Sequence, residues 1–236
     1  MNKILSLKIA FLFLYFFLKL LNIFSKFKTG LKDPKKGLEY LILGDKNFNT
    51  LQNLNTHSCF SIDKTENPLE SQMTQPTDIH EHLQTLHMLT VELNLKNILE
   101  LGTRTGESTI ALLLAAKEIG GKVTSVDVDP CEPAKQNVKN LDLESFWTFI
   151  QHDDLKLNWN EEIDHLFIDT SHTYDHTVLE FKKFEPLVKK GGLITLHDIV
   201  SCPPVLDAIN DYISNRKDLR FYKFFHNNGL GVIRKV

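Results

Sequence analysis

The chain has 236 residues, of which 42% are hydrophobic and 24% charged, and this composition argues against a mainly disordered protein. The formal net charge of −3, without basic runs interleaved with aromatic residues, argues against nucleic-acid binding. The three cysteines, Cys59, Cys131 and Cys202, form no C-x-x-C pair. We therefore expect neither a disulfide framework nor a zinc ribbon, and a reducing, cytoplasmic compartment fits best.

Residues 1–30 are apolar and cationic, and they contain no acidic residue. No small-residue cleavage pattern follows the apolar run, which disfavours a secretory signal peptide. Residues 4–24 are long enough for a spanning helix if Lys8 and Lys19 reach the two interfaces. A helix over 4–26 with its lysines on one stripe would instead lie in a membrane surface. We predict attachment to the cytoplasmic face of a membrane, the alternative being a helix packed on the domain or a partner.

Residues 31–70 read as a linker and variable region, to which the sequence assigns no role. An alternating pattern of helices and strands then fills residues 71–236. Its first half predicts, in order, a helix with Asp78 as N-cap, a strand, a helix closed by Gly120 and a second strand, over 78–95, 97–101, 109–120 and 122–129.

The second half of this pattern is richer in strands. It predicts strands over 146–151 and 165–169, a helix over 177–190, a turn at Gly191–Gly192, a strand over 193–198, a helix over 203–215 and a final strand pair around 227–229. Such alternation predicts a mostly parallel, doubly wound α/β sheet with helices on both faces. Ligands of such sheets bind beyond the carboxyl ends of the strands.

A glycine-containing turn, "GTRTGES", follows the strand over 97–101 and opens a helix. Its backbone can approach a ligand closely at Gly102 and Gly106. Asp127 stands 21 residues beyond Gly106, where a carboxylate can accept hydrogen bonds from ribose hydroxyls. Arg104 occupies the middle glycine position of a dinucleotide fingerprint, which disfavours NAD, and no Lys-Ser/Thr pair follows to form a P-loop.

These residues resemble the class I S-adenosylmethionine-dependent methyltransferases, whose E-x-G-x-x-x-G motif is matched by Glu100, Gly102 and Gly106. The chain is more closely similar to the branch of macrolide-sugar O-methyltransferases and cephalosporin hydroxylase-like proteins. That likeness rests on "QPTD" at 75–78, "FIDTSHTY" at 167–174 and "GLGVIRK" near the end, and it covers about residues 71–236.

The resemblance implies a Rossmann-like sheet of seven strands with one reversed, and S-adenosylmethionine as cofactor. Carried over by position, the expected cofactor-binding residues are Gln75, Asp78, Glu100, Gly102, Thr103, Arg104, Gly106, Ser108, Asp127, Asp153 and Asp154.

Ionisable residues end two strands that should lie side by side. Asp169 ends the strand in "HLFIDTSHTYDH", while His197 and Asp198 end the next parallel strand. We predict a divalent cation on Asp169 and Asp198, completed by His197 or water, with His172 as the base that takes the acceptor's proton. Mg²⁺ or Mn²⁺ is expected, although the imidazole of His197 suits zinc, iron or copper better than magnesium.

The resemblance supports these roles, because the related enzymes carry a metal-binding Asp, a catalytic His and an acidic pair at these positions. The alternative is structural: Asp169 and Asp198 would cap turns or helix starts. We expect His165 and His176 to be hydrogen-bonded structural histidines.

The predicted function is a metal-assisted, S-adenosylmethionine-dependent O-methyltransferase. Its expected acceptor is a hydroxyl of a sugar, glycan or other small polyol, with a lipid-linked or cell-surface glycan favoured if the N-terminal helix binds a membrane. A metal-independent methyltransferase and a membrane-attached, non-catalytic S-adenosylmethionine-binding protein are the alternatives, and self-association into a homo-oligomer stays open.

Overall fold

The computed structural model describes residues 68–73 and 77–236, all within one unit of the chain, Ile62–Val236. The predicted N-terminal helix, most of the predicted linker and Gln75 lie outside the described residues. Among the helices that are described, none combines the length and apolarity needed to cross a bilayer.

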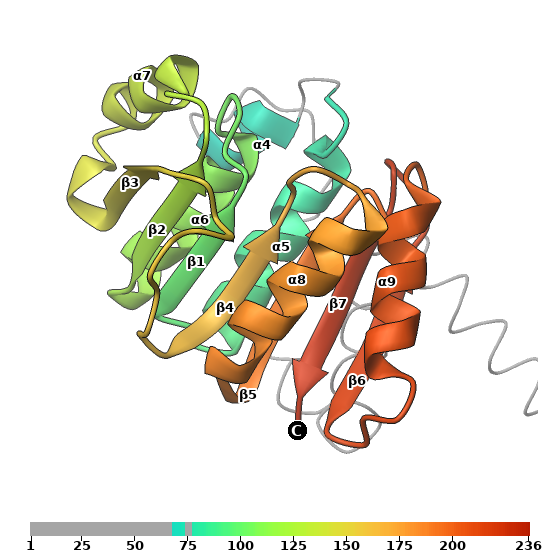
Figure 1. Cartoon of the computed structure of the whole chain (residues 1–236). Helices are drawn as coiled ribbons and strands as arrows, with labels where there is room; N and C mark the ends of the chain where they lie inside the picture. The colour runs from blue at the N-terminus through green and yellow to red at the C-terminus, as the bar shows by residue number, and fades with distance from the viewer. Residues whose placement is uncertain (1–67, 74–76) are drawn as a thin grey trace, which may run out of the picture. The chain divides into compact units, whose positions relative to one another are not determined.

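Seven strands of the described chain form one sheet in the order β3-β2-β1-β4-β5-β7-β6 (Figure 1). The strands are β1 Asn97–Leu101, β2 Lys122–Asp127, β3 Trp147–Gln151, β4 Ile163–Ile168, β5 Val188–His197, β6 Leu219–Phe224 and β7 Leu230–Lys235. The β3-β2-β1-β4-β5 pairs are parallel, and β7 runs antiparallel to both of its neighbours. The expected seven-stranded sheet with one reversed strand is therefore confirmed.

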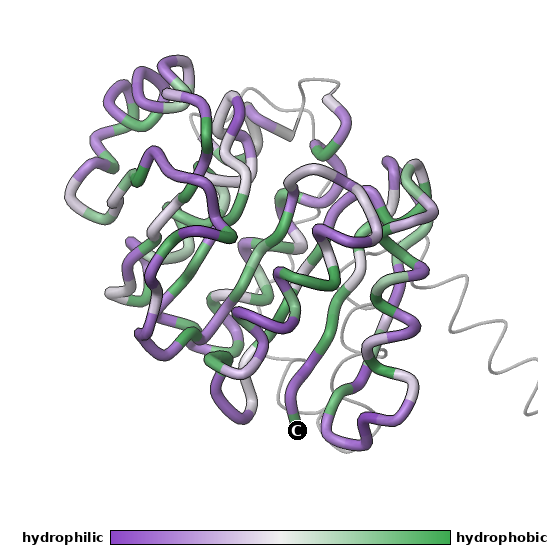
Figure 2. The backbone as a smooth tube through the Cα atoms, viewed as in Figure 1, coloured by the Kyte–Doolittle hydropathy of each residue, from purple (hydrophilic) through white to green (hydrophobic). Residues whose placement is uncertain are grey.

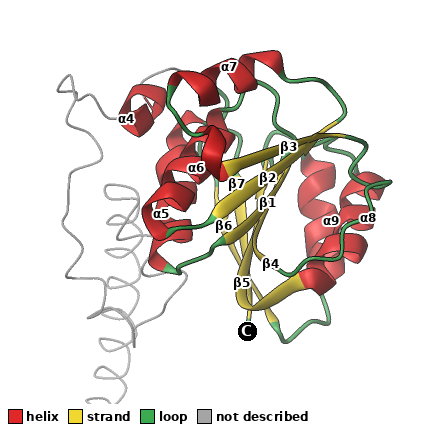
Figure 3. Ribbon diagram, turned by 90° about the vertical axis from the view of Figure 1, so that its left-hand side faces the viewer, coloured by secondary structure: helices red, strands yellow, loops and turns green. Residues whose placement is uncertain are grey.

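Helices cover both faces of the sheet, with α5 and α6 on one side and α8 and α9 on the other (Figure 3). The described helices are α4 Pro68–Met73, α5 Leu83–Glu92, α6 Glu107–Ile119, α7 Glu132–Asn140, α8 Tyr174–Phe184 and α9 Pro203–Ile213, with 3-10 turns at His80–His82, Glu144–Phe146 and Glu185–Leu187. This is the doubly wound arrangement that the alternating pattern predicts.

The core lies along the middle strands of the sheet, and Figure 2 shows hydrophobic residues along these strands. All six residues of β4 are buried, as are the last four of β1. A strand covered on both faces is mostly apolar along its length. The mostly apolar runs "NILEL" and "HLFI" therefore predict these strands from the sequence. Leu99, Leu166 and Ile194 pack there with Phe181 of α8.

Two predicted boundaries are wrong. The helix expected over 177–190 is α8, which begins at Tyr174 and ends at Phe184, because Pro186 has no N–H to continue it. The strand β5 begins already at Val188 and contains a register shift against β4. The glycine pair therefore lies inside β5 and is not a turn before it.

The start of the helix predicted over 78–95 is also wrong. Asp78 caps no helix: a 3-10 turn over His80–His82 precedes α5, which begins at Leu83. The carboxylate of Asp78 instead pairs with Arg104, 26 residues away. Helix α7, between β2 and β3, was not predicted at all; it is short and polar, and Pro133 in its first turn was the available signal.

Candidate active site

The glycine turn, residues 102–108, lies between the carboxyl ends of β1 and β4, where the strand order reverses. Gly102 has φ +86°, and a Cβ there would lie 1.9 Å from the carbonyl oxygen of Asp169. The Asp169 N–H donates to the Leu101 carbonyl oxygen at 2.8 Å. Only glycine can occupy position 102, and because it has no Cβ the glycine turn can contact the end of β4.

Glu100 supports this turn from beneath. Its carboxylate is fully buried and accepts hydrogen bonds from Ser108 Oγ at 2.6 Å, Thr109 Oγ1 at 2.7 Å and Ser125 Oγ at 2.5 Å. Burial raises the pKa of Glu100 to about 7 against the opposing effect of these donors. Both Glu100 and Ser108, predicted to contact the cofactor, thus hold the start of α6 against β1 and β2, and direct contact stays a prediction.

Asp127, at the end of β2, is bound by the backbone of the glycine turn. Its Oδ2 accepts from Thr103 N at 2.8 Å and Arg104 N at 3.1 Å, and its Oδ1 accepts from Asp129 N at 2.9 Å. Burial alone would raise the pKa of Asp127, but these backbone donors outweigh it and hold the pKa below the usual value. The carboxylate is therefore ionised and fixed beside the turn, as a ribose acceptor requires.

Arg104 and Asp78 pair with each other across the opening of the turn. Nη1 and Nη2 of Arg104 donate to the two carboxylate oxygens of Asp78 at 2.7 and 2.6 Å. Thr103, by contrast, is buried, and its Oγ1 has no hydrogen-bond partner within the described chain. The fork between Arg104 and Asp78 ties the segment before α5 to the glycine turn.

The two aspartates after β3 point different ways. Asp153 accepts from Leu155 N at 3.0 Å and pairs with exposed Lys156 at 2.7 Å. Asp154 is buried, and both of its carboxylate oxygens lie 3.3 Å from His176 Nε2. Of the two predicted adenine-side residues, Asp153 is the one that stays near the surface.

Asp169, His172, His197 and Asp198 form a second group at the same sheet edge, here called the β4–β5 cluster. His172 Nε2 lies 2.9 Å from Asp169 Oδ1 and 3.1 Å from Asp198 Oδ2. His197 Nδ1 lies 3.3 Å from Asp198 Oδ2 and 3.6 Å from Asp169 Oδ2. All four predicted residues are therefore brought together.

The charges of the β4–β5 cluster stabilise one another. Burial would lower the pKa of His197, yet Asp169 and Asp198 raise it to about 10. Burial would raise the pKa of Asp169, yet His172 and His197 lower it to about 2. The hydrogen bond to Asp169 raises the pKa of His172 above its usual value.

Asn227, in the turn between β6 and β7, orients His197. Its carbonyl oxygen lies 3.2 Å from His197 Nε2, so Nε2 carries the hydrogen and Nδ1 faces the carboxylates. The side chain of Asn227 donates to Thr77 O at 3.1 Å and accepts from Glu81 N at 2.9 Å. In the sequence, Asn227 indicates only a turn, and no pattern around it predicts this role.

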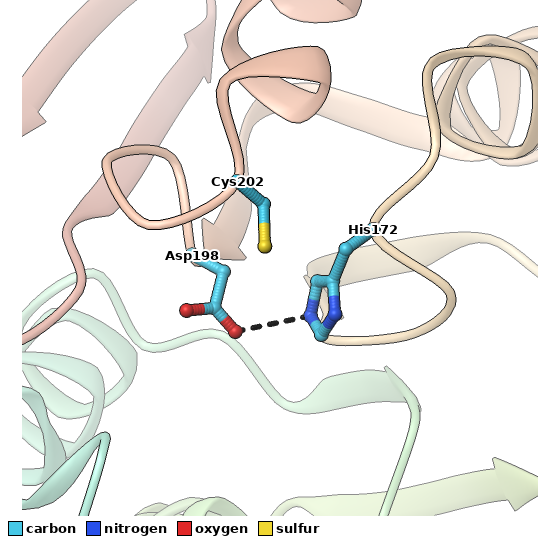
Figure 4. A group of neighbouring side chains, drawn as sticks. All are labelled: His172, Asp198 and Cys202. Atoms are coloured by element: carbon cyan, nitrogen blue, oxygen red, sulfur yellow. Dashed lines mark ion pairs between the residues drawn. The ribbon is translucent and has the colours of Figure 1, made fainter.

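Cys202 is a further neighbour of the β4–β5 cluster, and no motif in the sequence predicts it there. It points toward His172 and Asp198 in Figure 4, and one ligand atom from each of the three lies within 4.8 Å of the others. The predicted structural histidine His165 lies elsewhere, fully buried between Thr90 at 2.9 Å and Thr195 at 2.8 Å. Its structural interpretation is confirmed.

Part of the chain matches a family of known proteins. Residues 99–199, which hold both the glycine turn and the β4–β5 cluster, match a family profile described as a methyltransferase domain. This part of the chain is therefore similar to methyltransferase domains, in agreement with the resemblance seen in the sequence.

Two solved structures share the fold of this chain and were determined with a ligand bound. The S-adenosylhomocysteine-bound PaMTH1 of Podospora anserina superposes with a TM-score of 0.58 at 14% identity, covering 72% of this chain and 83% of that one. The O-methyltransferase TomG of Streptomyces achromogenes, involved in tomaymycin synthesis and solved with SAM, gives 0.56 at 16% identity, covering 73% and 91%.

A curated relative, the Tapetum-specific methyltransferase 1 of Arabidopsis thaliana, is 34% identical over 117 residues, or 46% of this chain. The chain spans about half the length of that relative, 49%. The narrower resemblance of the methyltransferase domain to macrolide-sugar enzymes stays a prediction.

Proposed function

We propose that the chain transfers a methyl group from S-adenosylmethionine to a hydroxyl of a small acceptor, with a divalent cation at the β4–β5 cluster. The observation that carries this proposal is the position of His172 Nε2, within hydrogen-bond distance of both Asp169 and Asp198 beside the glycine turn. His172 would act there as the base, beside the expected cofactor site.

The donor atoms of the β4–β5 cluster fit a cation. His197 is 1% exposed, and its Nδ1 makes no hydrogen bond although two carboxylates face it at 3.3 and 3.6 Å. Donors that share one ion at about 2.1 Å are separated by about 3.4 Å in tetrahedral geometry. Asp169, His197 and Asp198 would therefore hold the ion, and the carbonyl of Asn227 would fix the histidine's orientation from behind.

When bound, such an ion would lower the pKa of the acceptor hydroxyl. His172 would accept the hydroxyl proton at Nδ1, because its Nε2–H donates toward Asp169 and Asp198, and these carboxylates would stabilise the imidazolium that forms. S-adenosylmethionine would supply the methyl group: the acceptor oxygen would form the C–O bond as the S–C bond breaks, and the sulfur would keep the electron pair as S-adenosylhomocysteine. The chain contributes alignment of the two reactants and a place for the proton.

The sequence resemblance favours a sugar, glycan or other polyol as acceptor. One observation favours an aromatic or alkyl hydroxyl instead: Val200 and Phe225, in the turns beside Asp198 and Asn227, are 43% and 64% exposed. The Val200 N–H donates to Asn228 O at 2.9 Å, which joins these two turns. An apolar acceptor would bury these side chains, whereas a sugar would gain less from them.

The test is methyl transfer from labelled S-adenosylmethionine to a panel of glycosides, polyols and phenols by the full chain. We expect His172→Ala and Asp169→Ala each to lower kcat by about 100- to 10,000-fold while cofactor affinity is kept. His87→Ala, whose imidazole pairs with Glu118 on α6, is the control histidine and should keep the wild-type rate.

Full activity in both variants would contradict the proposed mechanism. Full activity in the presence of a chelator would favour the metal-independent methyltransferase. Cofactor binding without transfer to any acceptor would favour the non-catalytic alternative.

A further inference from the structure

A third ionisable group lies outside the β4–β5 cluster and the glycine turn. Asp154 follows β3, while His176 and Glu180 stand four residues apart on the same face of α8. We call these three residues the α8 cluster. One ligand atom from each lies within 4.8 Å of the others, and Asp154 and Glu180 are 8% and 0% exposed.

The ion pairs within the α8 cluster are longer than typical charge-assisted hydrogen bonds. His176 Nε2 lies 3.3 Å from each carboxylate oxygen of Asp154 and 3.5 Å from Glu180 Oε1. Charge-assisted N–H···O bonds are typically about 2.7–2.9 Å, as between His172 and Asp169 at 2.9 Å. The observed separations match the roughly 3.4 Å between two donors that share one zinc ion at about 2.1 Å.

Glu180 has a buried oxygen without a partner. Its Oε1 accepts from Thr170 Oγ1 at 2.7 Å, but its Oε2 is buried and makes no hydrogen bond within the described chain. Lys183, the nearby ammonium, donates to the main-chain carbonyl of Asp154 at 2.6 Å. A fully buried carboxylate with an unused oxygen is costly, and a cation is one group that would satisfy it.

We propose that Asp154, His176 and Glu180 form a second cation site, for Zn²⁺ or a similar divalent ion that accepts nitrogen and oxygen ligands. Two carboxylates and an imidazole that releases its proton as the ion binds balance a charge of +2 and leave room for water as a further ligand. The ion would hold the loop after β3 against α8. Through Glu180 and Thr170, the residue after Asp169, it would also fix the loop that carries the base, so its role is positioning.

The test is zinc binding to the metal-free full chain, measured as stoichiometry by equilibrium dialysis with metal analysis and as the shift of Tm. We expect Glu180→Gln and His176→Gln each to bind one equivalent of zinc less than the wild type. The rise in Tm that this zinc ion causes should be lost as well. Asp175→Asn, a neighbouring exposed carboxylate on α8, is the matched control and should lose neither. Asp169→Asn should keep the equivalent bound at the α8 cluster, so failure of the β4–β5 site and failure of this one are distinguishable.

A measurement on the wild-type protein covers the case in which a variant does not fold. Anomalous diffraction at the zinc edge from crystals soaked in Zn²⁺ should show a peak about 2.0–2.2 Å from His176 Nε2 and from a carboxylate oxygen of Glu180. Unchanged stoichiometry in folded Glu180→Gln, or anomalous peaks only elsewhere, would overturn the proposal.

Discussion

The two halves of the ligand-binding edge are built from different chemistry. In the β1–β2 half, each carboxylate oxygen of Glu100 and Asp127 has a hydroxyl or backbone N–H donor. In the β4–β5 half, two carboxylates and two histidines crowd together, and His197 Nδ1 lacks a hydrogen bond. The carboxylates of the β1–β2 half, the proposed cofactor half, thus have donors within the chain, whereas His197 in the β4–β5 half, the proposed acceptor half, can take a further ligand.

The largest effect is expected where the two halves touch. Gly102→Ala places a Cβ 1.9 Å from the Asp169 carbonyl oxygen at φ +86°, so the turn must move. We expect a loss of about 3–5 kcal/mol in the free energy of unfolding, and cofactor binding should be lost with it. Urea unfolding and calorimetric titration measure the two effects.

Gly191→Ala is the matched control for this prediction. Gly191 has a similar φ of +82°, but a Cβ there would have open space around it. Only the cost of the left-handed conformation remains, about 1–2 kcal/mol. Equal effects of the two substitutions would mean that strain, and not the contact with β4, makes Gly102 necessary.

A smaller effect, dependent on pH, is expected from Glu100→Gln. An amide cannot accept all three hydroxyl donors, which costs about 1–3 kcal/mol. Because burial raises the folded-state pKa of Glu100 from 4.5 to about 7, the unfolded chain releases this proton first as pH rises. The wild type should therefore lose stability relative to the variant between pH 4.5 and about 7.

Urea unfolding of both proteins across this pH range checks the sign, with Glu118→Gln as a control for general charge effects. If the wild type instead gains stability relative to Glu100→Gln as the pH rises, the pKa of the buried Glu100 carboxyl is not raised in the folded state.

The smallest effect is expected at the surface link between Arg104 and Asp78. Their side chains are 59% and 34% exposed, so the coupling should be only about 0.5–1 kcal/mol and should weaken with salt. A double-mutant cycle with Arg104→Ala and Asp78→Ala measures it. A coupling above about 2 kcal/mol that does not weaken with salt would show that the Arg104–Asp78 pair is a rigid part of the proposed cofactor half.

Most of the sheet could be predicted because its signals are local. Apolar runs such as "NILEL", bounded by glycine or charged residues, gave β1 with its observed bounds. The errors came from non-local packing: the register shift of β5 depends on β4, and Asp78 pairs with Arg104 through space. Neither contact leaves a pattern in the adjacent sequence.

The β4–β5 cluster was predictable for a topological reason. Asp169 and the pair at 197–198 end neighbouring parallel strands, and such ends meet at one edge of the sheet. Cys202, Asn227 and Glu180 were missed because they reach their partners from a helix N-terminus, a hairpin turn and a helix face, without a motif that links them.

The measurement that tests the account most directly is calorimetric titration of S-adenosylmethionine into the full chain, with chelator and with added Mg²⁺ or Mn²⁺. If the proposed cofactor half needs no metal ion to bind S-adenosylmethionine, the wild type binds one equivalent with the same affinity in each condition. The affinity of Asp127→Asn for S-adenosylmethionine should then be at least about tenfold lower, or 1.4 kcal/mol. The neighbouring substitution Asp129→Asn should leave the affinity unchanged. No binding to the folded wild type, or unchanged binding in Asp127→Asn, would contradict the account.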